Sequence, residues 1–411
     1  MPKEIIKAYC EERLIIFAGA AISTEGTLPF PVTLYEDVKQ SLNIKTNLPF
    51  DQMMEKFVYR FGRKKLLKVI FDKIDYIKSF NDIYGFSTEF HRELSKLHYI
   101  RNIITTNWDS FFEEYCSAIP VVERYDLKLV ELNQRFVYKL HGSINFPRSM
   151  IITFHDTLQN KKKLTSGSFF SHLKKMFESN LILFIGYSFR DDDINTLLSR
   201  IKKINGYIIN KSNVKQKFLS SKKWIKTDAN HFIHRLNLEL TKKGYLLSEN
   251  LLNQMYPTLK TTLNIHHNKT SSISHKKQPT ILFSLAYQDG LIHAYQRVIL
   301  KYKTGEYLNP HIHVLFAKYF DIRITKCEQN KFLDVAYIDG YLNGLNSYLT
   351  GKKPQSYFYI YDYKKPIKNI KILLKKINSQ KIINKNAYKH VLEYSKKIHA
   401  SIVYQHTPFL F

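Results

Sequence analysis

The sequence predicts an α/β fold built around a doubly wound parallel, Rossmann-like sheet. Short apolar runs alternate with helical segments through the first 210 residues, which is typical of such a sheet. Four of these runs end in small, polar or ionisable residues, where an open parallel sheet binds its ligands. The four segments are LIIFAGAAIS (14–23), ITTNWD (104–109), YKLHGS (138–143) and LILFIGYSFRDDDIN (181–195).

The N-terminal residues predict the first strand and the helices around it. Residues 1–45 indicate a helix, a strand, a glycine turn and a second helix that begins near Thr33. Residues 46–100 carry apolar residues at three- and four-residue spacing among many basic ones, which indicates amphipathic helices. We expect this segment to be a helical insertion that follows the first strand and helix.

Strands and helices continue in alternation up to residue 210. The acidic start and basic end of residues 191–204 complement a helix dipole, so we expect a helix there. The other elements expected are strands at 102–106, 136–140, 181–186 and 206–210, and a helix at 165–180.

A polar stretch divides the chain into two parts. Residues 266–280 (HHNKTSSISHKKQPT) are rich in Ser, Lys and His and are expected to link a sheet domain at 1–265 to a module at 281–411. This second module is expected to be basic and mixed α/β. Its segments 281–287, 311–325 and 356–363 mix strand and helix signals, and its Lys-rich tail from Ile367 looks helical.

The composition indicates a cytoplasmic protein. No run approaches the ~20 apolar residues of a membrane helix, and the start MPKEIIKAYCEER lacks the features of a secretory signal. The three cysteines, Cys10, Cys116 and Cys327, form no CxxC pair. This favours a reducing compartment and argues against a disulfide framework or a cysteine zinc site.

The chain carries a formal net charge of +28, and the charge is uneven. Residues 211–411 hold 33 Lys and Arg against 11 Asp and Glu. One explanation is an AT-rich genome, whose codons favour Lys, Ile and Asn. The other is contact with nucleic acid or another polyanion, made directly or through a partner.

The first two strand ends offer groups for a nucleotide. Gly19, Ala20, Ala21 and Ser23 resemble a loop whose backbone N–H groups hold a pyrophosphate at a helix start, although an ordinary strand-to-helix turn explains them too. After the second strand, Thr106 lies beside an Asn-x-Asp pair. Asn107 is suited to orient a water or a ribose hydroxyl. Asp109 is suited either to bind a ribose or to cap the next helix.

The other two strand ends complete the candidate site. His141, followed by Gly142, has an unperturbed pKa of about 6.5, which suits a general base at neutral pH. Gly186 and Ser188 end the most apolar strand, and Ser188 is suited to bond a phosphate or a ribose. Asp191–Asp193 fit a helix start better than a metal site, because no second acidic cluster is present. The sequence has neither a GxxxxGK[ST] loop nor an HExxH motif.

Taken together, GAAIS, TTNWD, KLHGS and FIGYSFRDDDIN resemble the sirtuin (Sir2) NAD-binding family over about residues 10–215. The similarity is closest to the Sir2-like domains of bacterial anti-phage defence proteins. It implies that Gly19, Ala20 and Ser23 hold the NAD pyrophosphate and that Gly186 to Ser188 line the adenosine end. It also implies that Asn107 and His141 are catalytic and that Asp109 binds the ribose.

Three departures from the family pattern bear on the reaction. Ala21 replaces the third residue of a Gly-Ala-Gly loop, where a Cβ is expected to crowd the pyrophosphate or oppose a positive φ. The zinc module with paired CxxC, which helps protein deacylases present their substrate, is missing. Trp108 stands where a smaller or phenolic residue is usual and is expected to alter access to the nicotinamide.

These observations lead to two hypotheses. The first is a gated NAD⁺ hydrolase of an abortive-infection system, with NAD as substrate and with no zinc or other metal. The second is a nucleic-acid-associated subunit of a defence complex that binds NAD or ADP-ribose without turnover, which the net charge and Ala21 motivate. The resemblance further implies an oligomer and an Argonaute-like or HerA-like ATPase partner, without membrane contact.

Overall fold

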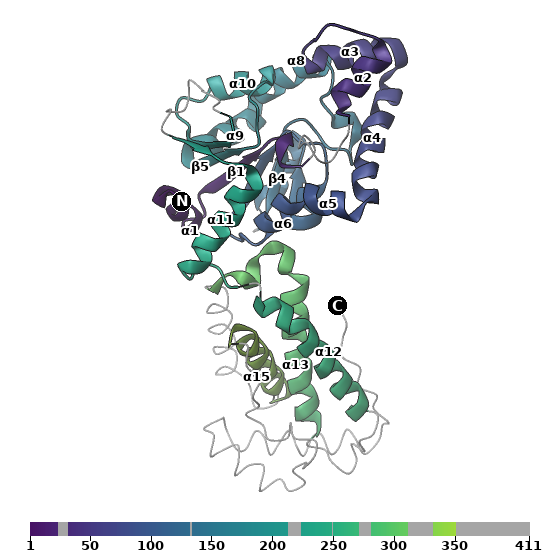
Figure 1. The fold of residues 1–411 in the computed structure, drawn as a ribbon. Helices are drawn as coiled ribbons and strands as arrows, with labels where there is room; N and C mark the ends of the chain where they lie inside the picture. The colour runs from purple at the N-terminus through teal and green to yellow at the C-terminus, as the bar shows by residue number, and fades with distance from the viewer. Residues whose placement is uncertain are drawn as a thin grey trace. The chain divides into compact units, whose positions relative to one another are not determined.

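The computed structural model describes residues 1–23, 32–131, 134–212, 223–248, 250–270, 281–310 and 332–350. These residues form two compact units (Figure 1). The first unit comprises Met1–Leu246 together with Lys303–Gly305 and contains the sheet. The second unit comprises Leu247–Tyr302 and the residues from Glu306 onward, and its described elements are helices.

The first unit is built on a seven-stranded sheet in which every neighbouring pair is parallel. The strand order is β3-β4-β2-β1-β5-β6-β7, as in a doubly wound fold. This confirms the predicted fold class and all five expected strands. The two short edge strands, β3 and β7, were not expected. The strands are β1 (Leu14–Ala18), β2 (Asn102–Thr105), β3 (Ile119–Val121), β4 (Phe136–Lys139), β5 (Leu181–Ile185), β6 (Asn205–Asn210) and β7 (Trp224–Lys226).

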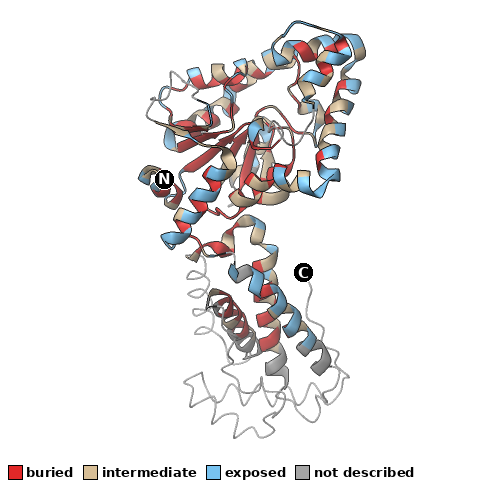
Figure 2. Cartoon of the chain, viewed as in Figure 1, coloured by how far each residue is buried: buried red, intermediate tan, exposed pale blue. Residues whose placement is uncertain are grey.

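Helices cover both faces of the sheet, so the central strands are buried along their whole length (Figure 2). On one face Phe17, Tyr138 and Phe184 pack with the helices α8 (Phe154–Leu164), α9 (Gly167–Ser179) and α10 (Asp192–Ser199). The other face is covered by the helices α1 (Lys3–Cys10), α6 (Glu89–Ser95), α7 (Phe111–Cys116) and α11 (Ala229–Lys242).

The strand register brings the four predicted site segments together at the carboxyl ends of the central strands. The paired residues Ala18, Thr105, Lys139 and Ile185 lie at one level across β1, β2, β4 and β5, which are neighbours in the sheet. The loops that follow these strands therefore begin side by side. The chain leaves β1 toward one side of the sheet and β5 toward the other, so the topological switch point lies between these two strands.

The expected helical insertion is present and has its own core. Within the expected bounds of 46–100 it comprises the helices α3 (Phe50–Phe61), α4 (Arg63–Ser79) and α5 (Asn81–Ser87), followed by α6, and α2 (Leu34–Leu42) precedes it. Helix α2 begins beside Thr33, as predicted, because Thr33 forms a capping box with Glu36. Met54, Phe57 and Leu66 of α3 and α4 belong to a separate buried cluster against which Trp108 packs.

The described part of the second unit contains three helices, α12 (Asn250–Thr270), α13 (Ile281–Leu300) and α15 (Phe332–Thr350). Helices α13 and α15 cross closely at two glycines. A Cβ on Gly290 or on Gly340 would lie 1.9 Å from a carbonyl oxygen of the other helix, so no larger residue fits at either position.

Two expectations for this half of the chain differ from the structure. Residues 281–287 show no strand character and lie within α13, and residues 266–270 of the expected linker end α12. Apolar runs of this length do not distinguish a strand from a buried helix, which explains the first difference. The remaining linker residues 271–280, the segments 311–325 and 356–363, and the tail from Ile367 lie outside the described residues.

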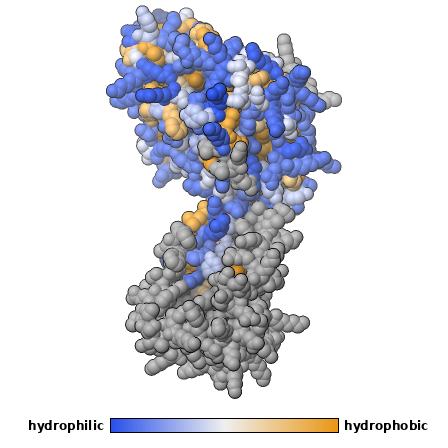
Figure 3. Space-filling view, turned by 180° about the vertical axis from the view of Figure 1, so that it is seen from behind, coloured by the Kyte–Doolittle hydropathy of each residue, from blue (hydrophilic) through white to orange (hydrophobic). Residues whose placement is uncertain are grey.

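The surface of the first unit that Figure 3 shows is largely hydrophilic, with apolar residues in small separate groups. Such scattered apolar residues are normal for a protein surface. Of the helices that the structure describes, none is both long enough and apolar enough to span a bilayer.

Candidate active site at the carboxyl ends of the central strands

The loop after β1 touches the loop after β5 at the switch point. The amide of Ala21 donates to the carbonyl oxygen of Gly186 at 3.3 Å. A Cβ on Gly19 would lie 2.5 Å from the same oxygen, so this approach requires glycine. Gly186 itself adopts a positive φ of 62°. Gly19, Ala20 and Gly186 therefore lie together, as the segment order predicts.

The backbone amides of the first loop are occupied within this conformation. The chain forms a single 3-10 turn, η1 (Ala20–Ile22), rather than the expected helix start. The amides of Ile22 and Ser23 donate to the carbonyl oxygens of Gly19 and Ala20. These amides are therefore engaged in this conformation, and their binding of a diphosphate stays a prediction. Ala21 is exposed and is not among the described residues with positive φ, so its methyl group causes no backbone strain.

The turn after β2 holds Asn107 in a fixed position. Its backbone amide donates to the Thr105 hydroxyl at 3.0 Å, and that hydroxyl donates to the carbonyl oxygen of Ala18 at 3.0 Å. The Asn107 side-chain nitrogen lies 3.4 Å from both the Gly19 carbonyl oxygen and Ser23 Oγ. Its Oδ1 is buried and bonds none of the described groups. Thr106, also predicted for the site, is half-buried, and its amide donates to Ala18.

Asp109 bonds the start of α7 from one residue before the N-cap, which is Ser110 rather than the expected Asp109, and it also faces the site. Its Oδ1 accepts from the backbone amide of Phe111 at 3.1 Å, within the first turn of α7. Its Oδ2 accepts from Ser23 Oγ at 3.4 Å. Burial raises the pKa of Asp109, and the nearby Lys139 cation partly opposes this rise. Asn107, Asp109 and Ser23 thus form one buried polar cluster that spans the loops after β1 and β2.

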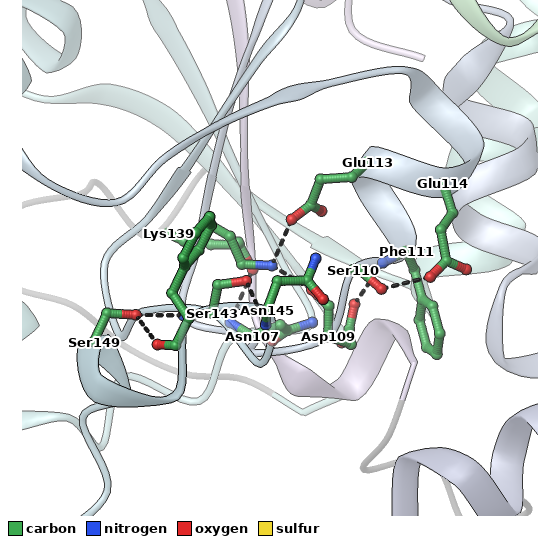
Figure 4. A network of polar contacts seen from close by, with 12 residues as sticks. Asn107, Asp109, Ser110, Phe111, Glu113, Glu114, Lys139, Ser143, Asn145 and Ser149 are labelled. Atoms are coloured by element: carbon green, nitrogen blue, oxygen red, sulfur yellow. Dashed lines mark hydrogen bonds and ion pairs between the residues drawn. The ribbon is translucent and has the colours of Figure 1, made fainter. Parts of the chain in front are cut away.

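A buried lysine, which the sequence did not single out, supports this cluster from β4 (Figure 4). The side chain of Lys139 is fully buried and donates to the Asp109 carbonyl oxygen and, at 3.1 Å, to Glu113 Oε1. Burial raises the pKa of Glu113, and Lys139 opposes this rise. The one available signal was a charged residue inside the apolar strand FVYKL. A lysine buried there requires a carboxylate partner.

His141 lies on the tight loop after β4. Gly142 follows it with φ of 80°, and a Cβ there would lie 2.1 Å from the Ser149 carbonyl oxygen, so the loop requires glycine. The Ile144 amide donates to the Trp108 carbonyl oxygen at 2.9 Å, which ties this loop to the turn after β2. Thr105 of β2 and Lys139 of β4 are paired in the sheet. Asn107 and His141 each follow one of these paired residues by two positions, so both lie just beyond the same end of the sheet.

The imidazole of His141 is paired with Asp193, for which the sequence predicted a position at a helix start. Nε2 of His141 lies 3.1 Å from Asp193 Oδ2, and the Asp193 side chain is only 1% exposed. Burial alone favours the neutral ring, but Asp193 raises the pKa of His141 to about 9. Asp191 is the N-cap of α10, and Asp192 and Asp193 lie in its first turn, as predicted; Asp193 in addition contacts His141.

The remaining predicted residues lie at the periphery of this arrangement. Ser188 is exposed on the loop after β5, next to Phe189, which is buried and has a φ of 57°. Trp108 packs against Phe50 of the helical insertion, with ring centroids 6.3 Å apart. The Trp108 side chain thereby connects the turn that carries Asn107 to the core of the insertion. Within the described ranges, no three His, Cys, Asp or Glu side chains are grouped to hold a metal ion.

Comparison with known proteins agrees with this geometry. Residues 101–240 match the family model described as a SIR2-like domain. The chain is 29% identical over 220 residues to the NAD(+) hydrolase ThsA of Cytobacillus dafuensis, which is 50% of this chain and 41% of that relative. It is 27% identical over 215 residues to the protein of the same name from Acinetobacter baumannii, which is 49% and 42% of the two chains.

A third relative extends the matched region. The NAD(+) hydrolase ThsA of Enterococcus faecium is 26% identical over 267 residues, which is 60% of this chain and 53% of that protein. The matched residues span about two fifths of the length of the first two relatives and about half of the third. Residues 101–240 are thus similar to a SIR2-like domain, and they include the strands β2, β4 and β5, whose ends carry predicted site residues.

Proposed function

We propose that this chain is an NAD⁺ hydrolase that cleaves the bond between nicotinamide and ribose. The observation that carries the proposal is Asn107 Oδ1, a buried acceptor without a partner among the described groups, held at the end of a central strand. A buried polar atom that bonds nothing is costly, so its retention favours a ligand that donates to it. The names of the similar proteins support NAD⁺ as that ligand.

The residues take the following roles in this proposal. As the C–N bond breaks, nicotinamide leaves with the bonding electron pair and the ribose carbon gains oxocarbenium character. Asn107 positions the attacking water or the ribose, and Asp109 binds a ribose hydroxyl. The water oxygen bonds to the ribose carbon, and its proton passes to His141 in the neutral form of the ring, so the rate is expected to rise with pH toward about 9. Gly19, Ala20, Ala21, Ser23 and Thr106 lie toward the diphosphate, with Gly186 and Ser188 toward the adenosine.

The state of the first loop supports a gated enzyme. The amides of Ala21, Ile22 and Ser23 are already bonded to carbonyl oxygens, so a diphosphate that uses them must first displace those bonds. We infer that a partner or ligand shifts this loop when the enzyme is activated. Together with the resemblance to defence proteins, this supports a cytoplasmic enzyme that depletes NAD⁺ during phage infection.

The test measures nicotinamide and ADP-ribose released from NAD⁺ by the full chain, and NAD⁺ content in cells that express it before and after phage infection. Asn107→Ala and His141→Ala are each expected to lower the rate by at least about 100-fold. Asn145→Ala is the matched control, since this exposed asparagine lies on the loop after β4 and only its backbone amide bonds Ser143. Full activity in both variants would overturn the assignment.

Contact with nucleic acid is a second proposal, supported by the net charge of +28 and by its concentration after Asn210. The test is titration of the protein with DNA and with RNA at two salt concentrations. The absence of binding at low salt would overturn this second proposal. In that proposal NAD or ADP-ribose is bound without turnover, so released nicotinamide separates it from the first. An Argonaute-like or HerA-like partner and an oligomeric state remain predictions, which co-purification and mass measurement test.

A further inference from the structure

The three consecutive acidic residues at the start of α10 occupy different surroundings. Asp192 is 69% exposed and pairs with Lys161 at 2.7 Å. Asp193 is 1% exposed, and both of its carboxylate oxygens lie within 3.3 Å of His141 Nε2. Of these two residues, only Asp193 is placed to hydrogen-bond the proposed base.

Other donors hold the Asp193 carboxylate in place. Asn160 of α8 donates to Oδ2 at 2.6 Å, and the Ile194 amide donates to Oδ1 at 2.9 Å. The same Asn160 amide nitrogen donates at 3.0 Å to the carbonyl oxygen of Leu140, the residue before His141. Asn160 therefore joins α8, α10 and the loop after β4. A carboxylate held by two further donors orients its histidine partner firmly.

This pairing defines which nitrogen of His141 is available for chemistry. Nε2 is occupied by Asp193, whereas Nδ1 bonds no group in the part of the chain that the structure describes. A carboxylate at Nε2 keeps a proton on that nitrogen and leaves Nδ1 as the basic one. The charged groups that act on the ring are Asp193 and, more weakly, Asp191, both at the start of α10, while α8 contributes the neutral Asn160.

We propose that Asp193, held by Asn160, is the positioning residue of His141, fixing its proton on Nε2 and presenting Nδ1 to the reacting groups. This role rests on the proposed function only in its last step, where Nδ1 of the neutral ring takes the proton from water. The imidazolium then formed donates from Nε2 to Asp193, so the carboxylate stabilises the charge that develops. Asp193 itself does not touch the substrate.

The experiment titrates His141 in the full chain by NMR, with isotope-labelled histidine and His141→Gln to assign its signal. Asp193→Asn is expected to lower the titration midpoint by about two pH units, because the ring keeps its burial but loses the carboxylate charge. Asp192→Asn, which removes the exposed neighbouring charge, is the matched control and is expected to move the midpoint by less than about 0.3 units. Asn160→Ala is expected to give an intermediate shift.

The outcomes separate this proposal from the proposed function. A wild-type midpoint at or below 6.5, or equal midpoints in the wild type and a folded Asp193→Asn, overturns the positioning role. If Asp193→Asn does not fold, the wild-type midpoint and Asn160→Ala decide. The expected shift in a chain that never releases nicotinamide supports the positioning role and overturns only the hydrolase. In an active chain, Asp193→Asn is expected to lower kcat about 100-fold with little change in KM.

Discussion

Two buried histidines of the first unit have pKa values that are shifted in opposite directions. His91, on α6, lies among Phe90, Phe111 and Phe112, and both ring nitrogens lack a hydrogen-bond partner among the described groups. Its pKa is lowered to about 3, chiefly by burial and further by Lys139. The pKa of His141 is raised to about 9 by a carboxylate. Burial alone therefore does not single out a candidate functional histidine, whereas a buried acidic partner does.

The largest expected effect comes from the buried cation Lys139, which acts on His91 and lies two residues before His141 in the chain. Lys139→Met is expected to destabilise the first unit by about 3–5 kcal/mol, since it leaves the Glu113 carboxylate buried without its cation. Urea unfolding followed by the fluorescence of Trp108 and Trp224, both in this unit, measures the loss. Lys161→Met, which breaks a far more exposed pair, is the control and is expected to cost at most about 1 kcal/mol. Equal losses would contradict this account of Lys139.

The second-largest expected effect is a loss of stability in acid that is caused by His91. A folded pKa below the unfolded value of about 6.5 means that the unfolded chain binds the extra proton, so stability falls as the pH drops below 6.5. The expected contribution is about 1.4 kcal/mol for each pH unit, or about 2 kcal/mol at pH 5. His91→Phe is expected to remove this part of the pH dependence. An unchanged slope between pH 6.5 and pH 5 would show that His91 keeps its proton when folded.

The third-largest expected effect is a loss of stability in base, which is caused by His141 and is opposite in direction to that of His91. Its folded pKa lies above the unfolded value, so its stabilisation is complete below pH 6.5 and is lost as the pH rises through about 9. Between pH 6.5 and 7.5 the expected loss is about 1 kcal/mol, and His141→Gln is expected to remove it. The same urea titration, carried out from pH 6 to 9, measures it. A loss in acid rather than in base would mean that Asp193 does not hold the proton on His141.

The sequence was sufficient for most of the sheet because β1, β2, β4, β5 and β6 are apolar runs bounded by polar residues. The edge strands β3 and β7 were missed because each has three residues, one with a proline and one ending in lysine. Residues 281–287 were ambiguous for another reason. Apolar runs fit a buried helix as well as a strand, and only packing decides between them.

In the candidate site, too, residues were predicted where the signal is local in the sequence and missed where it depends on a distant partner. Asn107, Asp109 and His141 were predicted because each directly follows a strand, which is a local property of the sequence. Lys139 and Asp193 were not, because their partners lie 26 and 52 residues away in the chain. The engaged amides after β1 were equally out of reach, since their conformation depends on the carbonyl oxygen of Gly186.

The pairing of β4 with β2 has a consequence for how this site tolerates insertions and deletions. Lys139 and His141 lie two residues apart at the end of β4, and one sustains the packing beneath Asp109 while the other is the proposed base. A single-residue slip of β4 against Thr105 would displace both at once. A length change between β3 and β4 is therefore tolerable only if it is absorbed before Phe136, whereas the three-residue edge strands carry no such double constraint.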